Sequence, residues 1–190
     1  GATSGRTIPQ ATKGATGAPD KEDLFGASVA ARDGYLVVGT PGDHVGRVKD
    51  TGSIQVFSLS RGKVKPVKRI SQDSAGIPGK DEPYDLFSNS VAIGQRCNGV
   101  PTVLVGAPNE GITHGHYDGS AWLIPLRTAK GCAATQLWAG HGLPGKPDYR
   151  GLGGLTAFLQ DRGAVDDDLV VGGHGSFSEG PDGWLYWISA

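Results

Sequence analysis

The stretch Leu36-Val37-Val38-Gly39-Thr40-Pro41 decides the fold, because the sequence contains it three times. It returns as Leu104-Val105-Gly106-Ala107-Pro108 and again as Leu169-Val170-Val171-Gly172-Gly173. A short apolar run that stops at glycine, with proline close by, is typical of a buried strand that ends in a turn. Three such runs in one chain indicate an internally repeated structure.

The segments on either side of these runs repeat in the same order. Upstream lie residues 23–30, 85–92 and 151–157, and downstream lie 50–57, 118–124 and 182–188. The pattern predicts strands at 24–31, 35–39, 52–59 and 64–71, at 86–93, 101–106, 119–126 and 134–139, and at 152–159, 167–172 and 183–189. Four short antiparallel strands per unit are what a β-propeller blade needs. We therefore expect an all-β chain of three blades, at 24–72, 86–139 and 152–190, with residues 6–10 as an outer strand of a neighbouring blade.

The composition narrows the class of protein. The net charge of −1 predicts no general affinity for nucleic acid, and no apolar run is long enough to span a bilayer. The chain contains no methionine, which favours a processed, secreted product. Cys97 and Cys132, the two cysteines, predict a disulfide in such a protein, and two unrelated buried thiols are the alternative. Their spacing does not favour a zinc site.

Phe25-Gly26-Ala27-Ser28-Val29-Ala30, then Leu36 to Pro41, then Asp50-Thr51-Gly52-Ser53, resembles the FG-GAP repeat of integrin α-subunit propellers. The loop at 72–79 resembles secreted actinobacterial FG-GAP proteins in particular. The resemblance runs from residue 6 to the end of the chain and implies a ring that typically has seven blades. The second unit lacks the glycine after Phe87, and the third has Leu152-Gly153 in place of Phe-Gly.

Three blades cannot close such a ring, and both ends of the chain would expose unpaired strand edges. We expect that another chain or fragment completes the propeller, with this chain as the C-terminal part of a larger, nicked propeller. Self-association of two copies into a six-bladed ring is the alternative.

The resemblance also implies where calcium could bind. FG-GAP blades often carry a calcium loop between their first and second strands, built from alternating carboxylates. In the first two units this segment has too few oxygen ligands. The third offers Asp161, Asp166 and Asp168, but Gln160, Arg162 and Ala164 occupy the early ligand positions, so a solvated acidic turn is the preferred interpretation. Calcium remains possible in the missing blades, and no cofactor is expected in this chain.

The histidines follow the repeated runs. His44, His114, His116 and His174 lie in connections from second to third strands, and His141 lies in the connection from a fourth strand to the next blade. In a four-stranded meander these connections emerge at the same face, which is the ligand face of the integrin family. Asp43 and Glu110 belong to the same loops. These seven residues are the candidates for ligand binding, although histidines tolerated in glycine-rich loops would give the same pattern.

Two functions fit this pattern. The first is a secreted, rigid module that binds a protein or glycan ligand through its loop-rich face. The second is a secreted hydrolase or lyase that uses the histidine-lined face, with or without a metal such as zinc. The sequence contains no nucleophile elbow, metal-binding HExxH motif or phosphate loop. We therefore expect no catalytic residues and favour the binding module.

Overall fold

The computed structural model describes residues 5, 7–15, 17–112, 117–146, 151–160, 163–173 and 183–190. These residues form the strands β1 (Ser28–Arg32), β2 (Tyr35–Thr40), β3 (Ser53–Ser60), β4 (Lys63–Ile70), β5 (Ser90–Arg96), β6 (Val100–Ala107), β7 (Ser120–Pro125), β8 (Thr135–Ala139), β9 (Gly142–Leu143), β10 (Leu155–Leu159), β11 (Asp168–Gly173) and β12 (Trp184–Ile188). Among them there is no helix long and apolar enough to cross a membrane. The predicted all-β class is confirmed.

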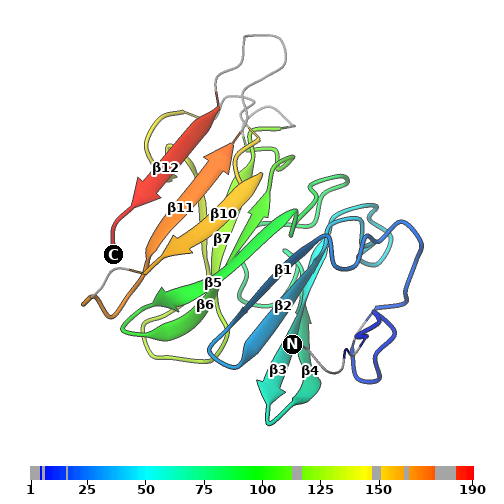
Figure 1. Cartoon of the computed structure of the whole chain (residues 1–190). Coiled ribbons are helices and arrows are strands. Elements are labelled where there is room, and N and C mark those ends of the chain that lie inside the picture. Colours follow the sequence, from blue (N-terminus) through cyan, green and yellow to red (C-terminus); the bar gives the residue numbers. More distant parts are fainter. Residues whose placement is uncertain are drawn as a thin grey trace.

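The strands form three sheets, which we call blades 1, 2 and 3 (Figure 1). Their orders are β1-β2-β3-β4, β5-β6-β7-β8-β9 and β10-β11-β12. Each is an antiparallel meander, and only the short pair β8-β9 is parallel. The three repeated apolar runs form the second strand of each blade, which is β2, β6 or β11. An uninterrupted apolar run suits this position because the second strand is covered on both faces.

The register of the strands is the same in all three blades. Gly39, Gly106 and Gly172 pair with Ser28, Ser90 and Leu155 on the first strands. The outer strand β4 alternates lysines with apolar residues, and Pro66 lies where its register against β3 shifts between Val56 and Phe57. Proline cannot donate to a ladder, so an outer strand at a bulge is a position that accepts it.

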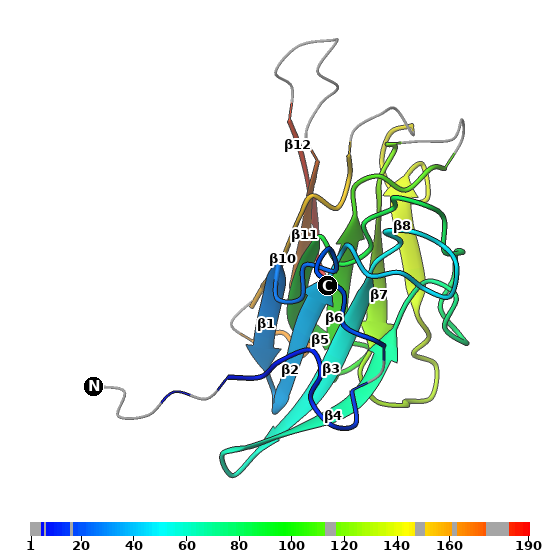
Figure 2. The same ribbon diagram turned by 90° about the vertical axis from the view of Figure 1, so that its right-hand side faces the viewer.

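The core consists of two layers between adjacent blades. Blade 1 packs on blade 2 through residues that include Val37, Ile54, Val105 and Trp122. Blade 2 packs on blade 3 through a second set centred on Leu104, Leu137 and Val171. The Trp122 ring lies edge-on to Phe87 at a centroid distance of 5.2 Å, and its indole N–H donates to Pro78 O at 2.8 Å. The blades are therefore stacked face to face, with β1, β5 and β10 side by side along one margin (Figures 1 and 2).

The first strand of each blade starts later than the sequence predicts. The first strands begin at residues 28, 90 and 155 instead of 24, 86 and 152. Leu24 and Leu86 have positive φ angles of 58° and 56°, so these segments turn before the ladder starts. Residues 7–10 are coil and turn here, and the expected pairing of residues 6–10 with a neighbouring blade stays a prediction, because that blade is not among the described residues.

Candidate functional site

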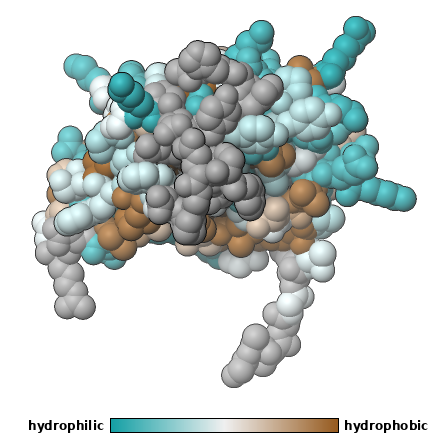
Figure 3. All heavy atoms as spheres, turned by 90° about the horizontal axis from the view of Figure 1, so that it is seen from above, coloured by the Kyte–Doolittle hydropathy of each residue, from teal (hydrophilic) through white to brown (hydrophobic). Residues whose placement is uncertain are grey.

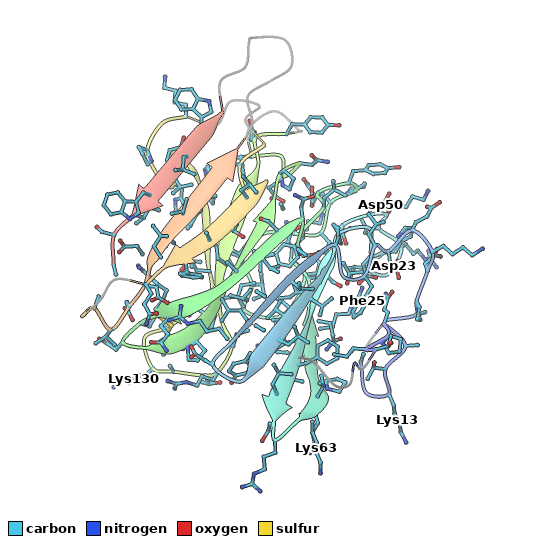
Figure 4. All side chains as sticks on the ribbon, viewed as in Figure 1. Lys13, Asp23, Phe25, Asp50, Lys63 and Lys130 are labelled. Carbon is cyan, nitrogen blue, oxygen red and sulfur yellow. A yellow bond between two sulfur atoms is a disulfide. The ribbon has the colours of Figure 1, made fainter. Side chains whose placement is uncertain are left out.

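The loops that connect second to third strands, and one blade to the next, lie at one end of the sheets, which we call the loop-rich end. Figure 4 shows Asp23 and Asp50 toward this end of blade 1, and Lys63 and Lys130 at the opposite, hairpin end. His44 lies in the β2–β3 loop and His141 in the turn after β8. His114, His116 and His174 lie outside the described residues.

In blade 1 the loop-rich end is fixed by a buried ion pair. Asp43, which is 4% exposed, accepts hydrogen bonds from Arg69 Nε at 2.8 Å, from Arg69 Nη2 and from Ser53 Oγ. Arg69 comes from β4 and also donates to His44 O at 3.3 Å, while Gly52 N donates to Asp43 O at 3.1 Å. Asp43 therefore holds the β2–β3 loop in place and is not available at the surface.

The same positions in blade 2 carry a carboxyl group without a cation. Glu110 follows Pro108 as Asp43 follows Pro41, and Gln136 on β8 occupies the position of Arg69 on β4. Glu110 accepts hydrogen bonds from Gln72 Nε2 at 2.7 Å and from Gln136 Nε2 at 3.4 Å. A neutral amide has replaced the guanidinium, so nothing in this contact balances the charge of an ionised Glu110.

Two further buried acids, Asp81 and Asp85, belong to the same region, and with Glu110 we call them the carboxyl cluster. Asp81 accepts from Ser71 Oγ and from Gln72 N, both at 3.0 Å. Asp85 accepts from the backbone N–H of Glu82 at 2.8 Å. The cluster is thus tied to the loop that leads from blade 1 into blade 2.

Burial controls the ionisation of the cluster. It raises the pKa of Glu110 to about 7, although the hydrogen bond from Gln72 favours the ionised form. Burial, and then the negative charge of Glu110, raises the pKa of Asp85 to about 8. The pKa of Asp81 is also raised by burial, against the hydrogen bond from Ser71. At neutral pH the loop-rich end therefore holds protons on groups that would be ionised in water.

The cluster does not have the arrangement of a metal site. In the part of the chain that the structure describes, no three His, Cys, Asp or Glu side chains gather as metal ligands. The amide oxygen of Gln72 is buried and has no hydrogen-bond partner among these residues. The cluster can store protons and hold the loops, and its acids, 2–5% exposed, lie below the surface.

The two described histidines are separate from the cluster. His44 is partly exposed, with Nδ1 at 3.1 Å from Gly42 O and 3.6 Å from Asp50 Oδ1. His141 is exposed and its ring stacks on Trp138 at a centroid distance of 4.1 Å. Both rings therefore present polar edges at the loop-rich end, where a ligand could reach them.

The weak metal candidates of the third unit have protein partners. Asp166 accepts from the backbone N–H groups of Gly99 and Asn98, at 2.8 and 3.2 Å. Asp168 accepts from Trp187 Nε1 at 2.9 Å and from Ala190 N at 2.8 Å. Asp161 lies outside the described residues. The two described carboxylates thus serve as hydrogen-bond acceptors within the fold.

The sequence did not single out Asp167, which links all three blades. Its carboxylate forms an ion pair with Arg32 of β1 at 2.6 Å and accepts from Gln95 N of β5 at 2.8 Å. Asp167 is 3% exposed. No spacing in the sequence marks this contact, because its partners are 135 and 72 residues away.

The predicted disulfide is present. Cys97, in the β5–β6 hairpin, is bonded to Cys132, in the β7–β8 connection, with Cα atoms 5.8 Å apart. The bond lies within blade 2 at the hairpin end, away from the loop-rich end.

The repeated register and the Asp-Leu-Phe turns can be compared with known families. Residues 18–57, which contain β1, β2 and part of β3, match the model of the FG-GAP repeat. This first unit is therefore similar to an FG-GAP repeat. The second and third units repeat the register of the matched unit, and FG-GAP repeats and disulfides are typical of extracellular proteins. No curated protein sequence matches the chain.

The turns before β1 and β5, which the sequence analysis placed inside the first strands, are each closed by an aspartate. Asp23 accepts from Asp20 N at 2.7 Å, and Asp85 accepts from Glu82 N at 2.8 Å. An aspartate that accepts an N–H three residues earlier fixes a tight turn. The repeated Asp-Leu-Phe was the signal in the sequence that could have identified Asp85 as a structural acid.

Proposed function

We propose that this chain is part of a secreted FG-GAP β-propeller that acts as a rigid binding module for a protein or glycan ligand. The ligand contacts the loop-rich end, and another chain or fragment completes the propeller. The observation that carries the proposal is that the loops at this end are held by buried hydrogen bonds. Asp43 fixes one loop through Arg69, and Glu110 fixes the next through Gln72 and Gln136.

Rigid loops favour binding because little conformational entropy is lost when a partner docks. Loops on a fixed scaffold are also where binding residues are concentrated. His44 and His141 are the described polar rings that a ligand could reach at this end. His114, His116 and His174, in equivalent loops of the sequence, belong to the same proposed surface.

The alternative is an enzyme, a secreted hydrolase or lyase. The burial of the carboxyl cluster favours the binding module instead. The groups with pKa values near 7 and 8, Glu110 and Asp85, would suit acid–base catalysis by their titration. They are 5% and 2% exposed, so the packed loops separate them from a substrate at the surface.

The test is to probe the full chain with a glycan array and a panel of purified extracellular proteins. We expect a bound ligand whose affinity falls in His44→Ala or His141→Ala and is unchanged in Lys63→Ala at the hairpin end. Binding should persist in EDTA. Equal loss in all three variants, or a hydrolytic activity on chromogenic ester and glycoside substrates that EDTA abolishes, would contradict the binding module.

A further inference from the structure

The outer halves of blades 1 and 2, formed by the third and later strands of each, contain positive charge and no negative charge. Between Asp50 and Asp73 the sequence has five lysines and arginines and no acid, and between Asp118 and Asp148 it has three and no acid. Figure 2 shows β4 and β8 on the side away from β1 and β10. In Figure 3 hydrophobic residues gather along the margin that lies toward the viewer in Figure 1, and hydrophilic residues gather on the opposite side.

Five of these cations lie toward the hairpin end, and we call them the basic edge: Arg61, Lys63, Lys65, Arg127 and Lys130. Arg61 is in the β3–β4 turn, and Arg127 and Lys130 are in the β7–β8 connection. Figure 4 shows Lys63 and Lys130 at this end of the two blades. All five residues are exposed, so an anion in solution can reach them.

The charge of the basic edge is not balanced within the fold. No ion pair among the described residues involves any of its five side chains. Asp33, an acid of the β1–β2 turn at the same end, accepts from Gln95 Nε2 at 3.0 Å and lies 3.7 Å from Arg32 Nε. The positive potential of the basic edge is therefore directed into solvent.

The β3–β4 hairpin holds its cations beyond the sheet. Ser60 pairs with Lys63, so residues 61 and 62 form a two-residue turn. Both have positive φ, 48° for Arg61 and 71° for Gly62, as in the tight turns that match the twist of a hairpin. Lys65 lies two residues from Lys63 and therefore on the same face of β4. The turn and the strand thus present three cations together.

Protection of a sheet edge explains only part of the basic edge. Lysines on an outer strand keep it from pairing with other strands, which accounts for Lys63 and Lys65 on β4. Arg61, Arg127 and Lys130 lie in connections, where there is no free strand edge to protect. These three cations indicate a surface that attracts an anion.

We propose that the basic edge binds an anionic polysaccharide that carries sulfate or carboxylate groups along its length. A polymer fits because the cations are exposed and divided between two blades, so that they do not converge on one small anion. A flexible chain can contact both hairpins and release counterions from each contact. This surface is separate from the proposed ligand surface at the loop-rich end and goes beyond it.

Two other anionic partners fit these residues less well. Single-stranded nucleic acid is held by aromatic side chains on which its bases stack, and residues 58–68 and 126–134 contain no aromatic residue. Binding at a membrane surface draws on apolar side chains that insert among the lipids, and the tips at 60–63 and 127–131 have no large apolar residue. The residues therefore favour a polysaccharide.

The test is binding of the full chain to immobilised dextran sulfate, with uncharged dextran as the matched polymer, at several salt concentrations. The net charge of the chain is −1, so attraction to a polyanion reports a local surface. We expect binding to dextran sulfate alone. The slope of log affinity against log salt should be about −3 to −4 for five contacts of a flexible chain.

Paired substitutions locate the contact. Lys63→Gln with Lys65→Gln should lower the affinity about 10-fold or more and make the salt slope shallower by about 1.4. Arg127→Gln with Lys130→Gln should do the same on blade 2. The matched control is Lys21→Gln with Lys80→Gln, the same change of charge at exposed positions of the loop-rich end, which should leave both quantities unchanged. Near-ultraviolet circular dichroism checks that each variant is folded.

Several results would overturn the proposal. They are absence of binding at low salt, equal binding to uncharged dextran, equal losses in the basic-edge and control variants, and a loss confined to one blade. Tighter binding to single-stranded DNA or to phosphatidylserine vesicles would replace the polysaccharide by a nucleic acid or a membrane. His44→Ala should bind dextran sulfate as the unaltered chain does. A failure here therefore leaves the binding module at the loop-rich end intact, and the reverse also holds.

Discussion

Glu110→Gln tests whether a buried carboxyl without a cation makes the protein less stable as the pH rises. The folded pKa of Glu110 is about 7 and its ordinary value is 4.5. Between these values the folded protein holds a proton that the unfolded chain has released, so the stability from this group is fully present below about pH 4.5 and is lost as the pH rises through 7.

The magnitude follows from the size of the shift. One pKa unit corresponds to about 1.4 kcal/mol, so full ionisation of Glu110 costs about 3 kcal/mol, of which about 2 kcal/mol falls between pH 5 and pH 8. Glutamine has the same shape, can accept the hydrogen bond from Gln72, and does not ionise. The variant also lowers the pKa of Asp85, because the charge of Glu110 helps to raise it. The two shifts are coupled and do not simply add.

The assay is urea unfolding at pH 5 and pH 8, followed by tryptophan fluorescence. We expect Glu110→Gln to lie within about 1 kcal/mol of the unaltered protein at pH 5 and to be more stable by about 2 kcal/mol at pH 8. Asp43→Asn is the control at the equivalent position, and it should lose about 3 kcal/mol at both pH values because Arg69 is left unpaired. If Glu110→Gln is destabilised equally at both pH values, the reasoning about the carboxyl cluster is wrong.

Three further predictions concern what holds the blades together, and each is measured by urea unfolding. Cys132→Ser should lower the free energy of unfolding by about 3–4 kcal/mol, as expected for opening a loop of this length, and an unchanged midpoint in non-reducing buffer would contradict it. Gly52→Ala should cost about 3 kcal/mol more than Gly62→Ala, because both have positive φ but only the Cβ at position 52 meets another blade; equal losses would contradict the close contact between Gly52 and the backbone of Phe87. Asp167→Ala should cost about 3–5 kcal/mol and Asp166→Ala about 1 kcal/mol, since only Asp167 is buried against an arginine, and the reverse order would disprove its role.

Strand content and repetition could be predicted from the sequence because they depend on local patterns. The apolar run from Leu36 to Gly39 specifies a buried strand and a turn wherever it occurs, and three copies imply three similar sheets. The disulfide was predictable because only Cys97 and Cys132 were available. The predicted starts of the first strands were wrong because Leu24 and Leu86 adopt positive φ angles. Leucine rarely adopts such a φ angle, and no local sequence pattern indicates it.

The candidate site was only partly predictable. The sequence placed Asp43 and Glu110 in equivalent loops, and by itself it determined the repeat, the order of the strands within it, and which two cysteines were available to pair. Only the tertiary structure decided that Asp43 is neutralised by Arg69 while Glu110 meets neutral amides, and that Asp167 joins three blades. The physical reason is range: backbone preference and side-chain alternation act between neighbours in the chain, whereas burial and charge pairing act between residues that folding brings together from far apart.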